Sequence, residues 1–271
     1  MDDPGRRALR ARTANAVANT RSLAGRDPSW GSTVSPFAGG WLVLAGRGMY
    51  LNQALSAGVE VEITEDGLDR LIERSVAVGV VPTVEVTANT GAASLRAIED
   101  RGFRHDAAVD IAALTRPVGR GDVGAPDDIV VVPVETEAAF RRWQETSAAA
   151  WGHVAAEARL ASDAFAAAAN ALDNEHLTLA VDTSDGRPLG CAVLTIRDGV
   201  AMLGGMSTLP VERRRGVQAA LIRHRLARAL DLGCDLAVTT VASGGPSERN
   251  LRRHGFSPLA TIRRFTLPAA R

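Results

Sequence analysis

The residue pattern with the clearest potential for chemistry is TLPVERRRGVQAAL, which runs over 208–221. A strand-like segment ends there, three arginines and a glycine follow, and a helical segment begins directly after Gly216. The first N–H groups of a helix have no partner within the helix and carry the positive end of its dipole. A glycine lets an anion approach these groups closely, and Arg213, Arg214 and Arg215 add positive charge. The pattern predicts a pyrophosphate-binding loop, unless Gly216 is only a turn residue and the arginines only a solvated surface.

The segments on both sides of this loop indicate a mixed α/β domain with an antiparallel meander before the loop. In chain order we expect a strand at 129–134, helices at 135–150 and 155–172, strands at 177–181, 189–196 and 200–206, a helix at 216–232, a strand at 236–241, a short helix at 247–253 and a closing strand at 261–267. Tight turns at 184–186 and 198–199 join the three strands of the meander.

The first half of the chain is also α/β in its pattern. We expect a helix at 6–23, strands at 41–45, 59–63 and 80–86, and a helix at 66–78 with Thr64 or Asp66 as its N-cap. The strand at 59–63 rests on Val59, Val61 and Ile63, which alternate with two glutamates.

The two halves resemble each other at an offset of 153 residues, the difference between Phe256 and Phe103. Further identical pairs at this offset are Thr87 and Thr240, Gly91 and Gly244, Ser94 and Ser247, Arg96 and Arg249, and Gly102 and Gly255. Each set follows a strand, spans a turn and a short helix, and ends at Gly-Phe, which indicates an internal duplication. The Gly- and Pro-rich segment 117–126 has the composition of a linker. We therefore expect like-folded domains at 1–120 and 127–271, with an exposed, protease-sensitive linker at 116–127.

The order of hairpin, arginine–glycine loop, long helix, strand and short helix resembles the GNAT superfamily of acyl-CoA-dependent N-acetyltransferases, over about 129–267. The phosphate loop of that superfamily reads Q/RxxGxG/A. Arg213, Gly216 and Gln218 stand at its three defined positions, and Gln218 departs from the pattern. The resemblance implies a mainly antiparallel sheet flanked by helices, in two tandem copies.

The same resemblance implies acetyl-CoA as the co-substrate. Backbone groups of the loop would hold the pyrophosphate, and the end of the preceding strand would pair with the pantetheine amides. The implied residues are Met206, Ser207, Thr208, Arg213, Arg214, Arg215, Gly216, Val217, Gln218 and Ala219. Gly204 and Gly205, just before them, indicate either a plain bulge or a close backbone approach.

Acetyl transfer also needs a proton for the departing thiolate. The superfamily commonly supplies it from a tyrosine four residues before the glycine of Gly-Phe, where this chain has Leu251. The only tyrosine of the chain is Tyr50, in the first half. Candidate substitutes near the same helix are Ser243, Ser247 and Asn250, although Ser247 is equally suited to cap that helix.

His153 and Glu145 lie where the superfamily lines its acceptor pocket and are candidates to accept the proton of the amine. His153 is also suited to be an ordinary surface or capping residue. His153 and Glu157 have the i, i+4 spacing of a helix face, but without further ligands we expect no metal site.

The first half has acidic residues where the second has arginines. Glu62, Glu65 and Asp66 would repel a pyrophosphate, by about 1 kcal/mol or more each at contact distance. We expect this half to be a degenerate copy that does not bind CoA and helps to wall the acceptor site; an unrelated α/β domain is the alternative.

Composition limits the remaining classes of function. Lys plus Arg (31) balances Asp plus Glu (31), and all 31 cations are arginines, so net charge does not favour nucleic acid as a partner. Cys191 and Cys234 have no paired spacing, and neither a signal peptide nor a membrane span is evident, so we expect a cytoplasmic protein. The expected oligomeric state is a monomer or a homodimer. The sequence thus predicts an N-acetyltransferase acting on a small amine. A non-catalytic CoA-binding regulatory protein is the alternative.

Overall fold

The computed structural model describes residues 3–119 and 126–268, and its contacts divide the chain into two compact units. The C-terminal unit consists of the described residues of Met1–Ala11, Thr115–Thr240 and Leu251–Ser257. The N-terminal unit consists of Arg12–Leu114, Val241–Asn250 and the described residues of Pro258–Arg271. Residues 120–125 of the expected linker lie outside the described part of the chain, and the domain ranges 1–120 and 127–271 stay a prediction.

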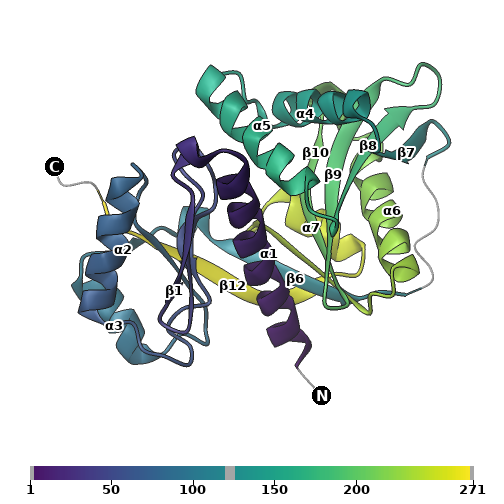
Figure 1. Ribbon diagram of the computed structural model, residues 1–271. Helices are drawn as coiled ribbons and strands as arrows, with labels where there is room; N and C mark the ends of the chain where they lie inside the picture. The colour runs from purple at the N-terminus through teal and green to yellow at the C-terminus, as the bar shows by residue number, and fades with distance from the viewer. Residues whose placement is uncertain (1–2, 120–125, 269–271) are drawn as a thin grey trace. The chain divides into compact units, whose positions relative to one another are not determined.

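The C-terminal unit is built on the predicted antiparallel meander (Figure 1). Its elements are β7 (Ile129–Pro133), α4 (Glu137–Trp151), α5 (Ala156–Asn170), β8 (Glu175–Asp182), β9 (Pro188–Arg197), β10 (Val200–Thr208), the 3-10 turn η3 (Pro210–Glu212), α6 (Val217–Asp231) and most of β11 (Leu236–Ala242). Strands β7, β8, β9 and β10 pair antiparallel in that order, and β11 pairs parallel to β10. The mainly antiparallel α/β fold expected from the sequence is confirmed.

Helices cover both faces of this sheet because its strands are apolar on both sides. On one face, Ala180 and Ala192 pack against Val217 and Leu221 of α6. On the other face, the residues that pack against Trp143 of α4 and Ala166 of α5 are Leu177, Leu179, Val181 and Cys191. Successive strand residues point to opposite faces, so this division fixes the register of β8.

The N-terminal unit contains a second sheet. Its elements are α1 (Pro4–Arg26) from Arg12 onward, η1 (Pro28–Trp30), β1 (Thr33–Phe37), β2 (Gly40–Leu44), β3 (Asn52–Leu55), α2 (Glu65–Ala77), β4 (Thr83–Val86), α3 (Ala92–Asp100), β5 (Arg104–His105), η2 (Ala107–Val109), the first residues of β6 (Ile111–Pro117), most of α7 (Pro246–Arg253) and β12 (Ser257–Thr266). The strand order is β1-β2-β3-β4-β12. Only β3 and β4 pair parallel in this order, and the last strand of the chain closes the sheet of the first half.

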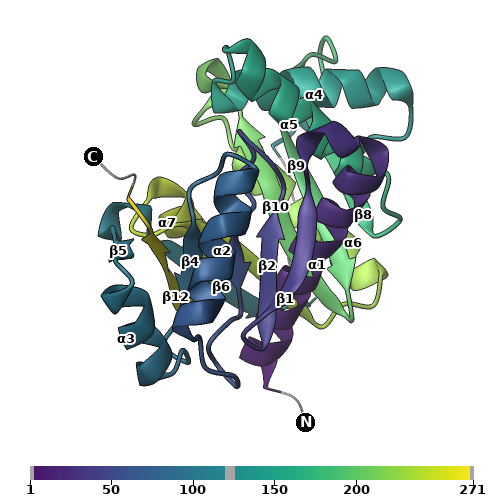
Figure 2. The same ribbon diagram turned by 60° about the vertical axis from the view of Figure 1, so that its left-hand side comes forward.

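The two faces of this second sheet differ in polarity. Val84 and Val86 of β4 belong to an apolar core with α2 and α3, which lie next to each other (Figures 1 and 2). On the opposite face α1 makes polar contacts: Arg12 pairs with Glu85, and the Thr13 and Ser56 hydroxyls lie 2.8 Å apart. Helix α1 therefore combines these polar contacts with buried apolar residues such as Val17 and Leu23.

Two expectations for the first half are wrong. Residues 59–63 form a loop, in which Val59 and Val61 are 47% and 53% exposed, and only Ile63 packs into the core. The strand that precedes α2 is β3, and β1 was not expected at all because it contains Pro36. The helix at 66–78 is confirmed, with Thr64 as its N-cap.

The two halves of the chain repeat one order of elements at the offset of 153 residues. Shifting α2 by 153 gives 218–230, which lies inside α6, and shifting α3 gives 245–253, which coincides with α7. Gly102 and Gly255 both have positive φ, 93° and 79°, and the phenylalanine after each is buried. The matching order supports the duplication inferred from the sequence.

Candidate functional site

The arginine–glycine loop leaves the N-terminus of α6 without a side-chain cap. Gly216 is the N-cap, with φ +88°, and it has no side chain to cap the helix. Arg214 also has positive φ, +70°. A Cβ added at Gly216 would lie 2.9 Å from Cγ of Pro126. The helix thus starts at a glycine without a side-chain cap, which is a feature of anion sites at helix N-termini.

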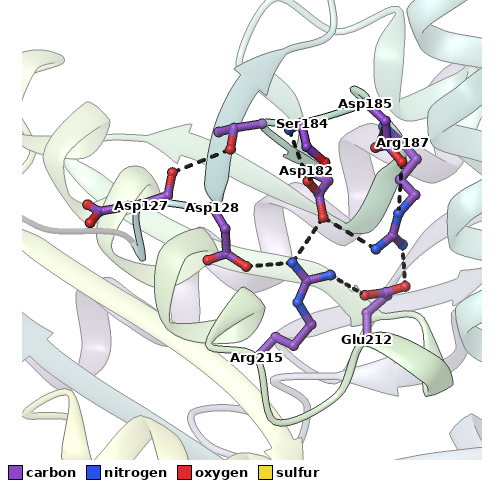
Figure 3. A network of polar contacts seen from close by, with 9 residues as sticks. Asp127, Asp128, Asp182, Ser184, Asp185, Arg187, Glu212 and Arg215 are labelled. Atoms are coloured by element: carbon purple, nitrogen blue, oxygen red, sulfur yellow. Dashed lines mark hydrogen bonds and ion pairs between the residues drawn. The ribbon is translucent and has the colours of Figure 1, made fainter.

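The loop is held by a network of ion pairs around Arg215 (Figure 3). Arg215 donates to Asp182 at 2.9 Å, to Glu212 at 2.7 Å and to Asp128 at 2.5 Å. Arg187 donates to Asp182 at 3.3 Å and also to Glu212. The Arg215 guanidinium thus pairs with carboxylates of the protein itself. Of this residue, we expect only the backbone N–H to contact a bound anion. Arg213 and Arg214 are exposed.

The network lowers the pKa of two of its carboxyl groups. Hydrogen bonds from Ser184 and Arg215 hold the pKa of Asp182 well below its ordinary value. Hydrogen bonds from Arg187 and Arg215 do the same for the pKa of Glu212. Since each carboxylate is stabilised in the folded state, each contributes stability above the ordinary carboxyl pKa and loses that contribution on acidification.

Replacing Asp182 with asparagine should therefore lower the melting temperature at pH 7, and the difference from the unaltered protein should shrink as pH falls below about 4. Calorimetry at pH 7, 5 and 3 measures this. The control is Glu137→Gln, which breaks an ion pair with Arg141 whose side chains are 78% and 67% exposed and should change little. A difference that stayed constant down to pH 3 would contradict the role given to Asp182.

Beyond Leu203, β10 separates from β11. Their parallel pairing runs from Val200 with Leu236 to Met202 with Val238, and the Thr239 hydroxyl then donates to the Leu203 carbonyl at 2.8 Å. In the described register, the rest of β10 pairs only with β9, with a bulge between Gly204 and Ser207. The strand end 204–208 therefore presents backbone groups to an extended amide chain.

Gly205 is required by this bulge. Its φ is +52°, and a Cβ there would lie 2.9 Å from Cγ2 of Val193 on β9. A side chain would thus be strained and would press on the neighbouring strand. The sequence left open whether the glycine pair marks a plain bulge or a close backbone approach. The structure has a bulge, at which the backbone of Gly205 lies close to Val193.

Arg225 of α6 stabilises the bulge through hydrogen bonds to backbone carbonyl groups. This residue was not among the functional residues expected from the sequence. This side chain is fully buried and donates to the carbonyl oxygens of Val193 at 3.0 Å, Gly204 at 3.1 Å and Leu221 at 3.0 Å. Its Nη2 lies 2.9 Å from Sδ of Met206. Burial lowers the pKa of Arg225 to about 9, because the charged guanidinium loses its hydration inside the protein. The sequence does contain a signal for Arg225, because an arginine on the apolar face of the helix expected at 216–232 indicates a buried cation.

Cys191 lies beside this site but is not a nucleophile. Its thiol is buried, 3.3 Å from the Ser207 hydroxyl, and burial raises its pKa to about 11. The thiol therefore stays protonated at neutral pH, which excludes a thiolate intermediate.

The expected acceptor-site residues lie on or after α4. Glu145 is exposed on α4. His153 is half-buried after the helix ends at Trp151, and its Nδ1 is buried without a hydrogen-bond partner. His153 and Glu157 do not lie on one helix face as their i, i+4 spacing indicated, because His153 lies in the loop before α5, which begins at Ala156. Within 3–119 and 126–268, no cluster of His, Cys, Asp and Glu is suited to hold a metal ion.

The expected acid candidates lie on or near α7. Ser247 is exposed in the first turn, and the turn is closed by Glu248, whose carboxylate accepts from the Gly244 N–H at 2.7 Å. Ser243, Ser247 and Asn250 belong to the N-terminal unit, whereas the arginine–glycine loop belongs to the C-terminal unit. Leu251 is fully buried. The roles of these residues stay predictions.

The N-terminal unit shows the opposite chemistry at the helix that corresponds to α6. The Thr64 hydroxyl accepts from the Gly67 N–H at 3.2 Å, and Glu65 and Asp66 occupy the first turn of α2. The preceding Ile63 N–H donates to the Ser94 hydroxyl at 3.0 Å. This helix end is satisfied internally and is acidic, which disfavours an anion.

Comparisons with known proteins agree with this geometry. Residues 137–256 match the model of the acetyltransferase (GNAT) family. A GCN5-related N-acetyltransferase from Kribbella flavida is similar in structure, with a TM-score of 0.66 and 20% identity over 97% of this chain and 96% of that one. A GNAT-family acetyltransferase from Novosphingobium aromaticivorans has a TM-score of 0.52 and 17% identity over 93% and 98%.

A tandem GNAT protein from the clavulanic acid biosynthesis pathway is also similar, with a TM-score of 0.57 and 13% identity over 75% of this chain and 69% of that one. A sequence comparison with curated proteins gives no match. Among the described residues, no helix is long and apolar enough to cross a membrane.

The structural likeness and the family match define the class of protein. Residues 137–256 match a GNAT acetyltransferase domain, and the similar solved structures share the fold. The resemblance inferred from the arginine–glycine loop is thereby confirmed.

Proposed function

We propose that the protein transfers an acetyl group from acetyl-CoA to the amine of a small molecule. The observation that carries this proposal is the N-terminus of α6, which begins at Gly216 without a side-chain cap, together with the end of β10, which pairs with β9 but not with β11 in the described register. The first feature fits a pyrophosphate and the second fits the amides of pantetheine. The proposed contacts are Met206, Ser207 and Thr208 on β10 and Arg213, Arg214, Arg215, Gly216, Val217, Gln218 and Ala219 in the loop.

The charges of the loop fit a dianionic group. Arg215 is balanced by carboxylates, so Arg213, Arg214 and the helix N-terminus supply the positive charge. The counterpart in the N-terminal unit has a capped, acidic helix end. We therefore propose that acetyl-CoA binds only to the C-terminal unit and that the N-terminal unit is a degenerate copy.

In the proposed reaction, the amine nitrogen forms a bond to the acetyl carbon and the carbon–sulfur bond breaks. The proton that the amine loses goes to His153, to Glu145 or to water. Ser247, Ser243 or Asn250 donates a hydrogen bond to the departing thiolate, and water supplies its proton. A free thiol has a pKa of about 8.5, so the leaving group needs only modest help at neutral pH.

A thiol-release assay with acetyl-CoA and a panel of small amines tests the proposal. Amine-dependent release of CoA supports it, and the mass of the product identifies the acceptor. If acetyl-CoA binds by calorimetry but no amine stimulates release, the protein is the CoA-binding regulator named as the alternative. If acetyl-CoA does not bind, the assignment of the loop is wrong.

Replacing Ser247 with alanine should lower kcat by about tenfold to a hundredfold and leave acetyl-CoA affinity unchanged, because one hydroxyl donor is lost and water remains. Tyr50→Phe is the paired variant and should keep most of the activity, because the Tyr50 side chain is 65% exposed. Steady-state kinetics of both variants measures this. If Tyr50→Phe abolishes turnover and Ser247→Ala does not, the proton donor is Tyr50.

A further inference from the structure

The N-terminal unit contains a pocket of about 400 Å³ that the proposed acetyl transfer does not use. It lies where the parallel strands β3 and β4 begin, and β12 contributes to its lining. Six of the lining residues are Met49, Gln53, Val80, Val109, Arg264 and Thr266. All of them belong to the N-terminal unit, and the volume is that of a site for a small molecule.

Gln53 provides a donor without a partner. Gln53 is one of the lining residues, it is only 2% exposed, and its Nε2 atom is buried without a hydrogen-bond partner. A buried amide N–H that pairs with nothing destabilises a protein. An acceptor atom of a ligand in the pocket would satisfy it.

The charges beside Gln53 favour an anion. Glu85 is buried, and Arg12 donates to its two oxygens at 2.7 and 2.9 Å. Arg264 pairs with the same carboxylate over a longer distance, 3.6 Å from Nε to Oε1, and also lines the pocket. Arg12 thus offsets the charge of Glu85, and Arg264 is the charged residue in the described lining of the pocket.

The strand register brings these groups to one face. Arg264 of β12 lies opposite Glu85 of β4, and Thr266 lies opposite Thr83. Directly opposite residues of antiparallel strands share a face, and this face is opposite to the one on which Val84 joins the apolar core. The pocket therefore combines a polar sheet surface with apolar side chains from the adjoining loops, among them Met49, Val80 and Val109.

We propose that this pocket binds a small organic monoanion, a carboxylate with a short apolar body. Arg264 pairs with the carboxylate, the Gln53 amide donates to one of its oxygens, and Met49, Val80 and Val109 contact the apolar part. The site is independent of acetyl-CoA and of the proposed transferase reaction.

Binding of butyrate, benzoate and phenylacetate to the intact chain, measured by ligand-observed NMR and calorimetry, tests this site. The neutral controls are the corresponding primary amides. At least one acid should bind, and its amide should bind at least about tenfold more weakly, because a charge-assisted hydrogen bond is lost. Acetyl-CoA affinity is measured in parallel, so failure of this site and failure of the transferase proposal are distinguished.

Two variants locate the binding. Arg264→Gln should weaken the acid at least about tenfold, whereas Arg101→Gln, which removes an exposed cation paired with Asp69 in the same unit, should not. Gln53→Leu should also weaken the acid while the melting temperature stays the same or rises, since an unsatisfied buried donor is removed. The proposal is overturned if none of the three acids binds, if the amides bind as tightly, or if binding survives Arg264→Gln and Gln53→Leu.

Discussion

Replacing Gly216 with glutamate should weaken acetyl-CoA binding by at least about a hundredfold, beyond the range of calorimetry at ordinary concentrations. Two effects add. The new side chain would place a negative charge at the helix end that is proposed to hold the pyrophosphate. Its Cβ would also lie 2.9 Å from Cγ of Pro126, at a backbone φ of +88° that side chains rarely adopt.

Gly233 offers a matched control at the other end of the same helix. It also has positive φ, +75°, and a Cβ there meets no atom within 4 Å. Gly233→Glu thus adds the same charge with comparable backbone strain, and acetyl-CoA affinity should be retained. Equal loss in both variants would mean that backbone strain, and not charge at the loop, is responsible. Unchanged affinity in Gly216→Glu would refute the assignment of the loop.

Replacing Arg225 with methionine should weaken acetyl-CoA binding by about tenfold to a hundredfold and lower the free energy of unfolding by about 1 to 3 kcal/mol. Removing a buried cation relieves its desolvation, which acts in the stabilising direction. That gain is offset because the carbonyl oxygens of Val193 and Gly204 lose their donor. The bulge then relaxes, and Met206 loses its contact with the guanidinium.

Arg228→Met is the control for this experiment, since Arg228 is exposed on the same helix. It should change neither acetyl-CoA affinity nor stability by much. Arg225→Lys should fall between the two, because a single ammonium group cannot reach all of the acceptors of a guanidinium. Chemical denaturation and calorimetry measure the two quantities. If Arg225→Met binds acetyl-CoA normally, the bulge is held by the strands alone.

The local sequence correctly predicted helix starts and turns, because the residues that specify each of them lie within a few positions of one another. A glycine after three arginines predicts an uncapped helix start, and the structure has this at Gly216. Thr64 before an acidic first turn predicts a capped start, which is also found. The Asp198-Gly199 turn predicts a hairpin, and β9 and β10 pair across it. In each case the backbone geometry depends on the side chains of the segment itself.

The sequence misled where a pattern has two explanations. Alternating valines and glutamates at 59–63 are typical of a half-buried strand, but this segment is the turn between β3 and α2. Pro36 indicates a break, yet it lies in β1, at the edge of the sheet. A proline is tolerated there because an edge strand does not need every N–H for pairing.

Only the tertiary structure decided which distant polar groups meet inside each unit. Arg225, Val193 and Gly204 are separated along the chain, and their hydrogen bonds exist because α6 packs on β9 and β10. Likewise Arg12, Glu85 and Arg264 meet because the last strand of the chain pairs with β4. The sequence by itself determined the resemblance to the GNAT family, the arginine–glycine loop and most of the element order, since those depend on local propensity and spacing. The support of the bulge and the proposed anion site depend on contacts between residues far apart in sequence, which no local pattern encodes.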